Sequence, residues 1–135
     1  MIPQGTKVAD KLIFLGMAGC LSCGFLMPLI QFCKDNGLAN EVLITEYSDK
    51  KEYHERATEI LNQLKIDVDF SIPVPFIYVQ VGDMARVSQQ PVIEECAMAI
   101  KMDLDESEEF DYFDGELDSY RMLNFLTKII TNTIF

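Results

Sequence analysis

Apolar residues in the first half of the chain follow strand and helix patterns in alternation. Residues 11–16 (KLIFLG) form a short apolar run closed by glycine, and residues 41–47 (EVLITEY) are rich in β-branched side chains, so each predicts a strand. Between them, residues 20–36 predict a helix that stops at Gly37. Residues 50–66 predict a second helix, because their apolar side chains recur at intervals of three and four and Ser48 or Asp49 can cap its start.

The second half begins with a different pattern. Proline cannot sit inside a central strand, so a strand at 76–81 (FIYVQV) begins at or after Pro75. A Gly-Asp turn follows, and residues 84–88 predict the hairpin partner. Residues 91–102 then predict a helix with proline in its first turn. The order βαβαββα predicts an α/β fold with a mixed four-stranded sheet, in which a parallel pair is extended by antiparallel strands.

The acidic residues are concentrated in one segment. The chain has 135 residues and a formal net charge of −11, and residues 103–118 hold nine acidic and no basic side chains. We predict one domain over 1–102, an acidic linker over 103–118, and a C-terminal helix over 119–135 that packs on the domain or docks a partner. The linker reading rests on charge repulsion, while three aromatic residues within the segment leave open a docking role.

Charge and hydropathy also exclude several classes of protein. A strongly negative protein is repelled by phosphate backbones, so we expect no nucleic-acid partner. The apolar runs are far shorter than the roughly 18 residues that a membrane span needs, so we expect no membrane association. The chain opens without the pattern of a signal peptide, and we therefore expect a reducing, cytoplasmic location.

The most specific motif is Cys20-Leu21-Ser22-Cys23, which follows a predicted strand and opens a predicted helix. Free backbone N–H groups and the positive end of the helix dipole lie close to a cysteine at this position, and both favour thiolate over thiol. The spacing places the second sulfur within disulfide reach of the first. We therefore predict a redox dithiol in which Cys20 is exposed and attacks, while Cys23 is shielded and resolves.

With these residues in place, the sequence resembles the thioredoxin/glutaredoxin family over about residues 8–102. A Cys-x-x-Cys motif opens a helix after a strand, and Pro28 lies five residues after the second cysteine. Val74-Pro75 precedes a strand and hairpin, where the family has a cis-proline, with Pro73 as the competing candidate. The order of elements also matches the core of that family.

The resemblance implies a thiol–disulfide oxidoreductase that acts on protein or low-molecular-weight disulfides. Cys20 and Cys23 would be catalytic, and Leu21, Ser22, Val74 and Pro75 would bind substrate. The Val74 backbone would pair with an incoming chain as a short strand. No organic cofactor and no metal are implied, and an external thiol reductant would recycle the dithiol.

Other features favour a redox-silent adaptor or structural subunit that binds a partner through its acidic tail and C-terminal helix. Phe14 stands where thioredoxins place a buried aspartate, and Ala18 and Gly19 stand where they carry tryptophan. The cysteine pair could also be half of a zinc site, although a second pair of ligands at suitable spacing is missing from the sequence.

The remaining reactive side chains have simpler interpretations. Cys96 lies on the apolar face of its predicted helix, and Cys33 lies about 80° from the helix face of Cys23. Both are interpreted as small core residues. His54 lies on a charged helix and is read as a surface histidine. Glu46 and Asp49 could form an acid–base pair, but nothing in the sequence directs them towards the cysteines.

Overall fold

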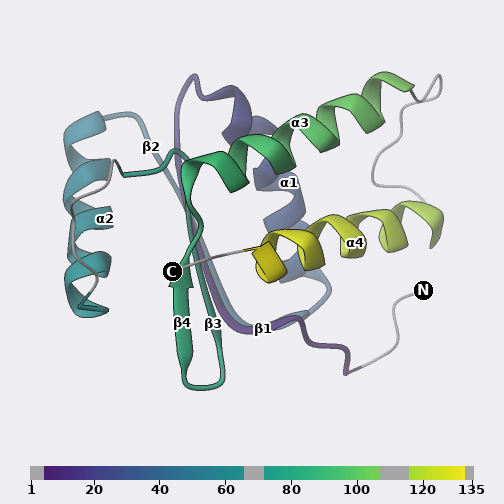
Figure 1. The fold of residues 1–135 in the computed structure, drawn as a ribbon, viewed down its shortest axis with the longest axis horizontal. Helices are drawn as coiled ribbons and strands as arrows, with labels where there is room; N and C mark the ends of the chain where they lie inside the picture. The colour runs from purple at the N-terminus through teal and green to yellow at the C-terminus, as the bar shows by residue number, and fades with distance from the viewer. Residues whose placement is uncertain (1–4, 66–71, 107–115, 133–135) are drawn as a thin grey trace.

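A mixed four-stranded sheet organises the protein, as Figure 1 shows. The structure is a computed structural model, and it describes residues 5–65, 72–106 and 116–132. The α/β class and the mixed sheet predicted from the sequence are confirmed. In chain order the elements are β1 (Ala9–Met17), α1 (Leu21–Asp35), β2 (Ala39–Tyr47), α2 (Lys50–Gln63), β3 (Phe76–Val81), β4 (Met84–Val87), α3 (Gln90–Glu106) and α4 (Glu116–Asn132).

The order of the strands across the sheet is β2-β1-β3-β4. Strand β1 pairs with β2 in parallel, with Leu12 opposite Val42, and with β3 in antiparallel orientation, with Ile13 opposite Tyr78. The hairpin turn between β3 and β4 contains Gly82, whose φ of +59° favours glycine. Since β1 is central, it is buried along most of its length, which explains its unbroken apolar pattern.

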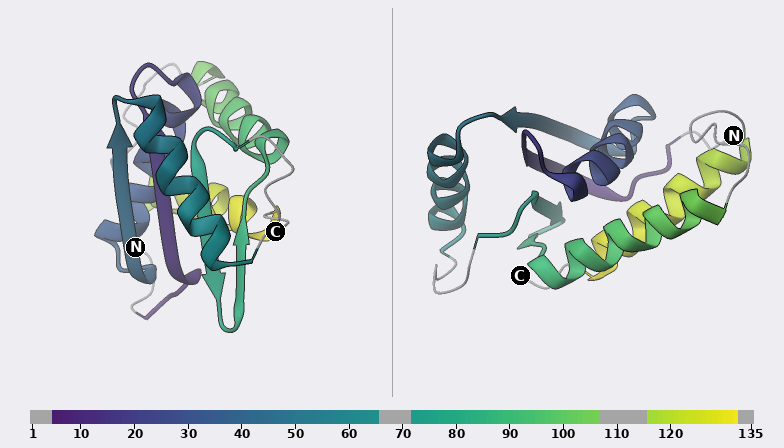
Figure 2. Two further views of the ribbon diagram at one scale, coloured as in Figure 1. Left: turned by 90° about the vertical axis from the view of Figure 1, so that its left-hand side faces the viewer. Right: turned by 90° about the horizontal axis from the view of Figure 1, so that it is seen from above.

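Alternate residues of β1 serve two separate cores, one on each face of the sheet. Leu12 and Phe14 face α1, α3 and α4, while Ile13 and Leu15 face α2. Figures 1 and 2 show α2 alone on one side of the sheet and the other three helices on the opposite side. The period of two residues along a strand produces this division.

Helix α4 is part of this layered structure. Its residues Met122, Leu126 and Ile129 are at most 2% exposed, and they lie in the same core as α1 and α3. Figure 2 shows α3 and α4 running side by side. The apolar stripe of the last helix is therefore covered by the protein itself.

Several helix ends differ from the predicted ones. Helix α3 continues to Glu106, because no glycine or proline interrupts it after Met102, and α4 begins at Glu116. Both ends of the predicted acidic linker 103–118 are therefore helical, and its middle part, 107–115, lies outside the described residues. Helix α2 ends at Gln63 instead of residue 66, since Lys65 adopts a φ of +58° that no helix can continue through.

Within the residues that the structure describes, no helix is long and apolar enough to cross a membrane.

Candidate dithiol site

The carboxyl end of β1 positions Cys20. The chain leaves the strand through a short turn, in which the Cys20 N–H donates to the Met17 carbonyl oxygen at 3.3 Å and Gly19 has a φ of +80°. A side chain is strained at that φ, so glycine suits the turn. Cys20 is then the N-cap of α1, and its carbonyl accepts the first helical hydrogen bond, from Gly24, at 3.2 Å. The turn thus places one sulfur at the positive end of a helix.

Cys20 and Cys23 are joined as a disulfide, and their Cα atoms are 5.2 Å apart. The Cys23 backbone N–H also donates to Cys20 Sγ at 3.1 Å. The acceptor atom of an N-cap side chain is normally an oxygen, whereas here it is the sulfur of Cys20. In the reduced protein the same N–H group and the helix dipole would stabilise negative charge on Cys20 Sγ.

The two sulfurs differ in access to solvent. Cys20 is half-buried, whereas Cys23 is 3% exposed. A Cβ atom on Gly16 would lie 3.0 Å from Phe14 Cε1, 3.5 Å from Met27 Cε and 3.7 Å from Cys23 Cβ, which places the inner cysteine among apolar groups. Cys20 is thus less exposed than the sequence predicted, but it is still more accessible than the buried Cys23. Between them along the chain, Leu21 is 83% exposed and Ser22 is half-buried.

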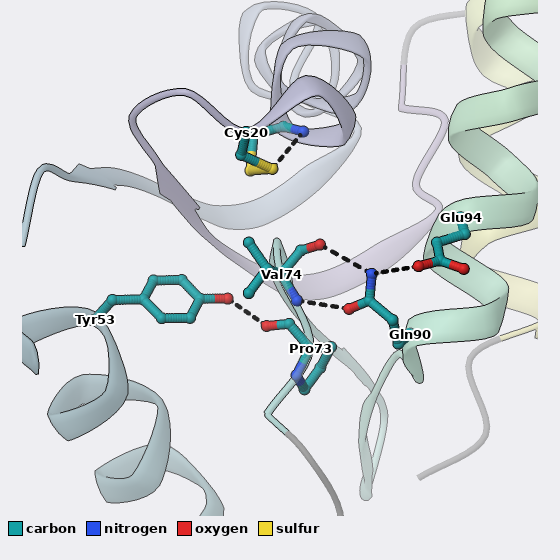
Figure 3. The surroundings of a disulfide bond; sticks show 7 residues. Cys20, Tyr53, Pro73, Val74, Gln90 and Glu94 are labelled. Carbon is teal, nitrogen blue, oxygen red and sulfur yellow. Dashed lines mark hydrogen bonds between the residues drawn. A yellow bond between two sulfur atoms is a disulfide. The ribbon is translucent and has the colours of Figure 1, made fainter. Parts of the chain in front are cut away.

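The segment before β3 lies beside this disulfide, as Figure 3 shows. The Val74-Pro75 peptide bond is cis, as the sequence predicted, and Pro75 rather than Pro73 is the residue concerned. Val74 packs against the core that also contacts Cys20. The fold therefore brings Val74 close to the motif, although the two are more than fifty residues apart in sequence.

Two further residues hold this segment, and sequence reasoning assigned neither to the site. The buried Tyr53 hydroxyl donates to the Pro73 carbonyl oxygen. The Gln90 side chain accepts from the Val74 N–H at 2.8 Å and donates to the Val74 carbonyl oxygen at 3.3 Å. In the sequence, Tyr53 is one of several apolar residues at helical spacing, and Gln90 directly precedes a predicted helix. No local sequence signal marks a hydrogen bond to a segment 16 or 20 positions away.

The phenol of Tyr53 is fully protonated at neutral pH. Burial raises its pKa, and a hydrogen bond with the Phe76 backbone opposes that rise only in part. Its hydroxyl therefore stays a donor to the Pro73 carbonyl, on the opposite side of the segment from Gln90 (Figure 3).

The two other cysteines are free and buried in the core, as predicted. Burial raises the pKa of the Cys33 thiol from 9.0 to about 11, with Lys7 opposing the shift. Burial also raises the pKa of Cys96, and Glu95 adds to the effect while Lys128 opposes it. Both thiols are therefore protonated and shielded at neutral pH.

The remaining candidates have other surroundings and contacts. His54 is half-buried rather than fully solvated, because its ring packs edge-on against Tyr53 with 5.9 Å between the ring centroids. Asp49 caps α2 by accepting from the Lys51 N–H at 2.8 Å, and Glu46 is exposed on β2. Asp49 therefore has a structural function at the helix start.

In the described ranges, no three His, Cys, Asp or Glu side chains are grouped so that they could hold a metal ion.

Comparison with known proteins adds no assignment. No family model matches the chain, and neither the curated proteins nor the solved structures contain a significant match.

Proposed function

We propose that this protein is a thiol–disulfide oxidoreductase whose reactive group is the Cys20–Cys23 dithiol. The observation that carries the proposal is the Cys23 N–H donating to Cys20 Sγ at the N-terminus of α1. This contact supplies a donor to the sulfur that is accessible, while the second sulfur is buried within disulfide reach. The arrangement supports an attacking thiolate and a shielded resolving thiol.

The reaction proceeds in two exchange steps. Cys20 thiolate attacks one sulfur of a substrate disulfide, and the other substrate sulfur leaves as a thiolate and takes a proton from solvent. Cys23, after losing its proton, attacks Cys20 Sγ in the mixed disulfide and releases the second substrate thiol. The substrate gains two electrons, and the dithiol loses two as it becomes the Cys20–Cys23 disulfide. An external dithiol then reduces the protein again.

We further propose that the fold is thioredoxin-like. The supporting features are the strand order β2-β1-β3-β4 and the antiparallel pairing of β3 with both β1 and β4. In addition, α2 covers one face of the sheet, and α1 and α3 cover the other. Helix α4 is then an addition that extends the layer of α1 and α3.

Reduction of insulin disulfides by dithiothreitol tests the activity. We expect the wild type to accelerate the reaction and Cys20→Ser to abolish the acceleration. Reduced Cys23→Ser, mixed with insulin after the dithiothreitol has been removed, should accumulate a mixed disulfide on Cys20. Cys96→Ala is the matched control and should retain the activity, because that thiol is buried and is not part of the disulfide. A wild type no faster than Cys20→Ser with both insulin and 2-hydroxyethyl disulfide would contradict the proposal.

A redox-silent adaptor is the second candidate. The observation that favours it is Phe14, which is fully buried beside Cys23 and offers no group to take a proton from that thiol. Against it, Met122, Leu126 and Ile129 of α4 are already buried in the core shared with α1 and α3, and Leu123, Phe125 and Ile130 are partly buried against that core. A wild type inactive towards both insulin and 2-hydroxyethyl disulfide would favour the adaptor.

A further inference from the structure

The Val74 backbone, which lies beside the disulfide, already has hydrogen-bond partners. Its N–H donates to Gln90 Oε1 at 2.8 Å, and its carbonyl oxygen accepts from Gln90 Nε2 at 3.3 Å. Both partners come from one side-chain amide, as Figure 3 shows. Both backbone groups of Val74 therefore already have a hydrogen-bond partner.

This pairing imitates a neighbouring peptide chain. A glutamine amide has the same donor and acceptor as a backbone peptide group. In an antiparallel pair, two residues that face each other exchange N–H and C=O bonds, and Gln90 completes this exchange with Val74. An extended substrate chain that added to this edge would need the same two groups.

The amide is held in this orientation from its other side. Gln90 is the first residue of α3, and its Nε2 also donates to Glu94 Oε1 at 3.2 Å, one turn further along the helix. The carboxylate can only accept, so it directs the NH₂ group towards itself and the Val74 carbonyl oxygen. The amide oxygen is then left facing the Val74 N–H. The helix start and Glu94 together pre-position the amide on this edge.

We propose that Gln90 is a specificity-determining residue that closes the Val74 edge to extended peptide chains. The dithiol is thereby directed towards small disulfides, which reach Cys20 Sγ without pairing with Val74. This inference rests on the proposed oxidoreductase function and narrows its substrate class. A peptide disulfide can react only after its chain has displaced the Gln90 amide.

The first test compares two disulfides with the same leaving thiol. One is 2-hydroxyethyl disulfide, and the other is an octapeptide whose single cysteine is disulfide-bonded to 2-mercaptoethanol. Pre-reduced, desalted protein is mixed with each, and its oxidation is followed by acid quench, alkylation and mass spectrometry. We expect Gln90→Ala to raise the rate constant for the peptide roughly tenfold, the scale of losing two competing hydrogen bonds, and to leave that for the small disulfide unchanged.

Two further variants sharpen this comparison. Gln90→Glu keeps the size of the side chain, but its carboxylate cannot donate to the Val74 carbonyl and repels Glu94, so it should open the edge as well. Gln63→Ala, at the exposed end of α2, is the matched control and should change neither rate. Equal rate ratios in the wild type, Gln90→Ala and Gln63→Ala would overturn the proposal.

A second test needs no redox chemistry. The oxidised, ¹⁵N-labelled protein is titrated with the octapeptide carrying serine in place of cysteine, and the Val74 amide signal reports binding. We expect Gln90→Ala to bind at roughly tenfold lower peptide concentration than the wild type. Equal affinities would refute the closed edge. Tighter binding by a variant, together with no reaction of any form with either disulfide, would uphold it and refute the oxidoreductase function.

Discussion

Replacing Tyr53 with phenylalanine removes one oxygen atom from the buried side of the segment that precedes β3. Tyr53 is fully buried on α2, and its hydroxyl is the donor to the carbonyl oxygen of Pro73, which is itself buried. The ring would remain, together with its edge-on contact with Tyr47 at 6.2 Å between ring centroids. The substitution therefore removes only the contacts of the hydroxyl, with the Pro73 carbonyl oxygen and with the Phe76 backbone, and keeps the ring in place.

The expected cost follows from leaving a buried carbonyl without its donor. An unpaired buried acceptor costs about 1–3 kcal/mol, because the group has lost water and gained no partner. We expect Tyr53→Phe to lower the free energy of unfolding by that amount, measured by urea denaturation at neutral pH. For a domain of this size, each kcal/mol also lowers the melting temperature by roughly 3–6 °C.

Tyr78→Phe is the matched control. Its hydroxyl donates to Gln80 Oε1 at 3.1 Å, and that half-buried amide can turn to water when the donor is lost. We expect this change to cost less than about 1 kcal/mol. If Tyr53→Phe proved no more destabilising than Tyr78→Phe, the argument that Tyr53 anchors the segment before β3 would be refuted.

Three other predictions concern the cysteines and the last helix. In the reduced protein, Cys20 should have a thiol pKa below that of a free cysteine. Mass spectrometry should therefore show that iodoacetamide alkylates Cys20 before Cys33 and Cys96. Faster labelling of either buried thiol would contradict the assignment of Cys20 as the nucleophile. Because burial raises the pKa of Cys33 from 9.0 to about 11, the unfolded chain loses a proton between these pH values that the folded chain keeps, so stability falls as pH rises through this window. Urea titrations at about pH 8 and about pH 10.5 should show a smaller loss for Cys33→Ala than for the wild type, and equal losses would contradict this cause. Leu126→Ala should cost about 2–5 kcal/mol, and the exposed Asn124→Ala less than about 0.5 kcal/mol; equal effects would show that α4 does not stabilise the core.

Local patterns in the sequence determined most of the elements. The unbroken apolar run at residues 11–16 predicted the central strand, because a strand covered on both faces needs apolar side chains at every position. Gly37 predicted the end of α1, and it has the φ of +62° that such a stop requires. Cys20 and Cys23 could be picked out from their spacing and their place after a strand, since both cues lie within a few residues.

Helix ends were less predictable where the residue that ends the helix is not one of the usual helix-stop residues. Lys65 ends α2 with a positive φ that lysine seldom adopts, so no sequence rule marks it. The acidic residues after Met102 suggested a linker, yet α3 continues to Glu106. Charge repulsion was overestimated there, because a helix needs only local backbone hydrogen bonds and the absence of a breaker to continue.

The surroundings of the disulfide were decided by the tertiary structure alone. Val74 was identified from its place before Pro75, and its backbone was expected to be free for a substrate chain. The fold instead delivers the start of α3 to the same point, and the Gln90 amide takes both backbone groups. Tyr53 reaches the neighbouring carbonyl from a helix on the other face of the sheet. A glutamine or a tyrosine has the same local propensity whether or not a distant carbonyl lies within reach, so these contacts exist only once the packing of the helices on the sheet has set the distances.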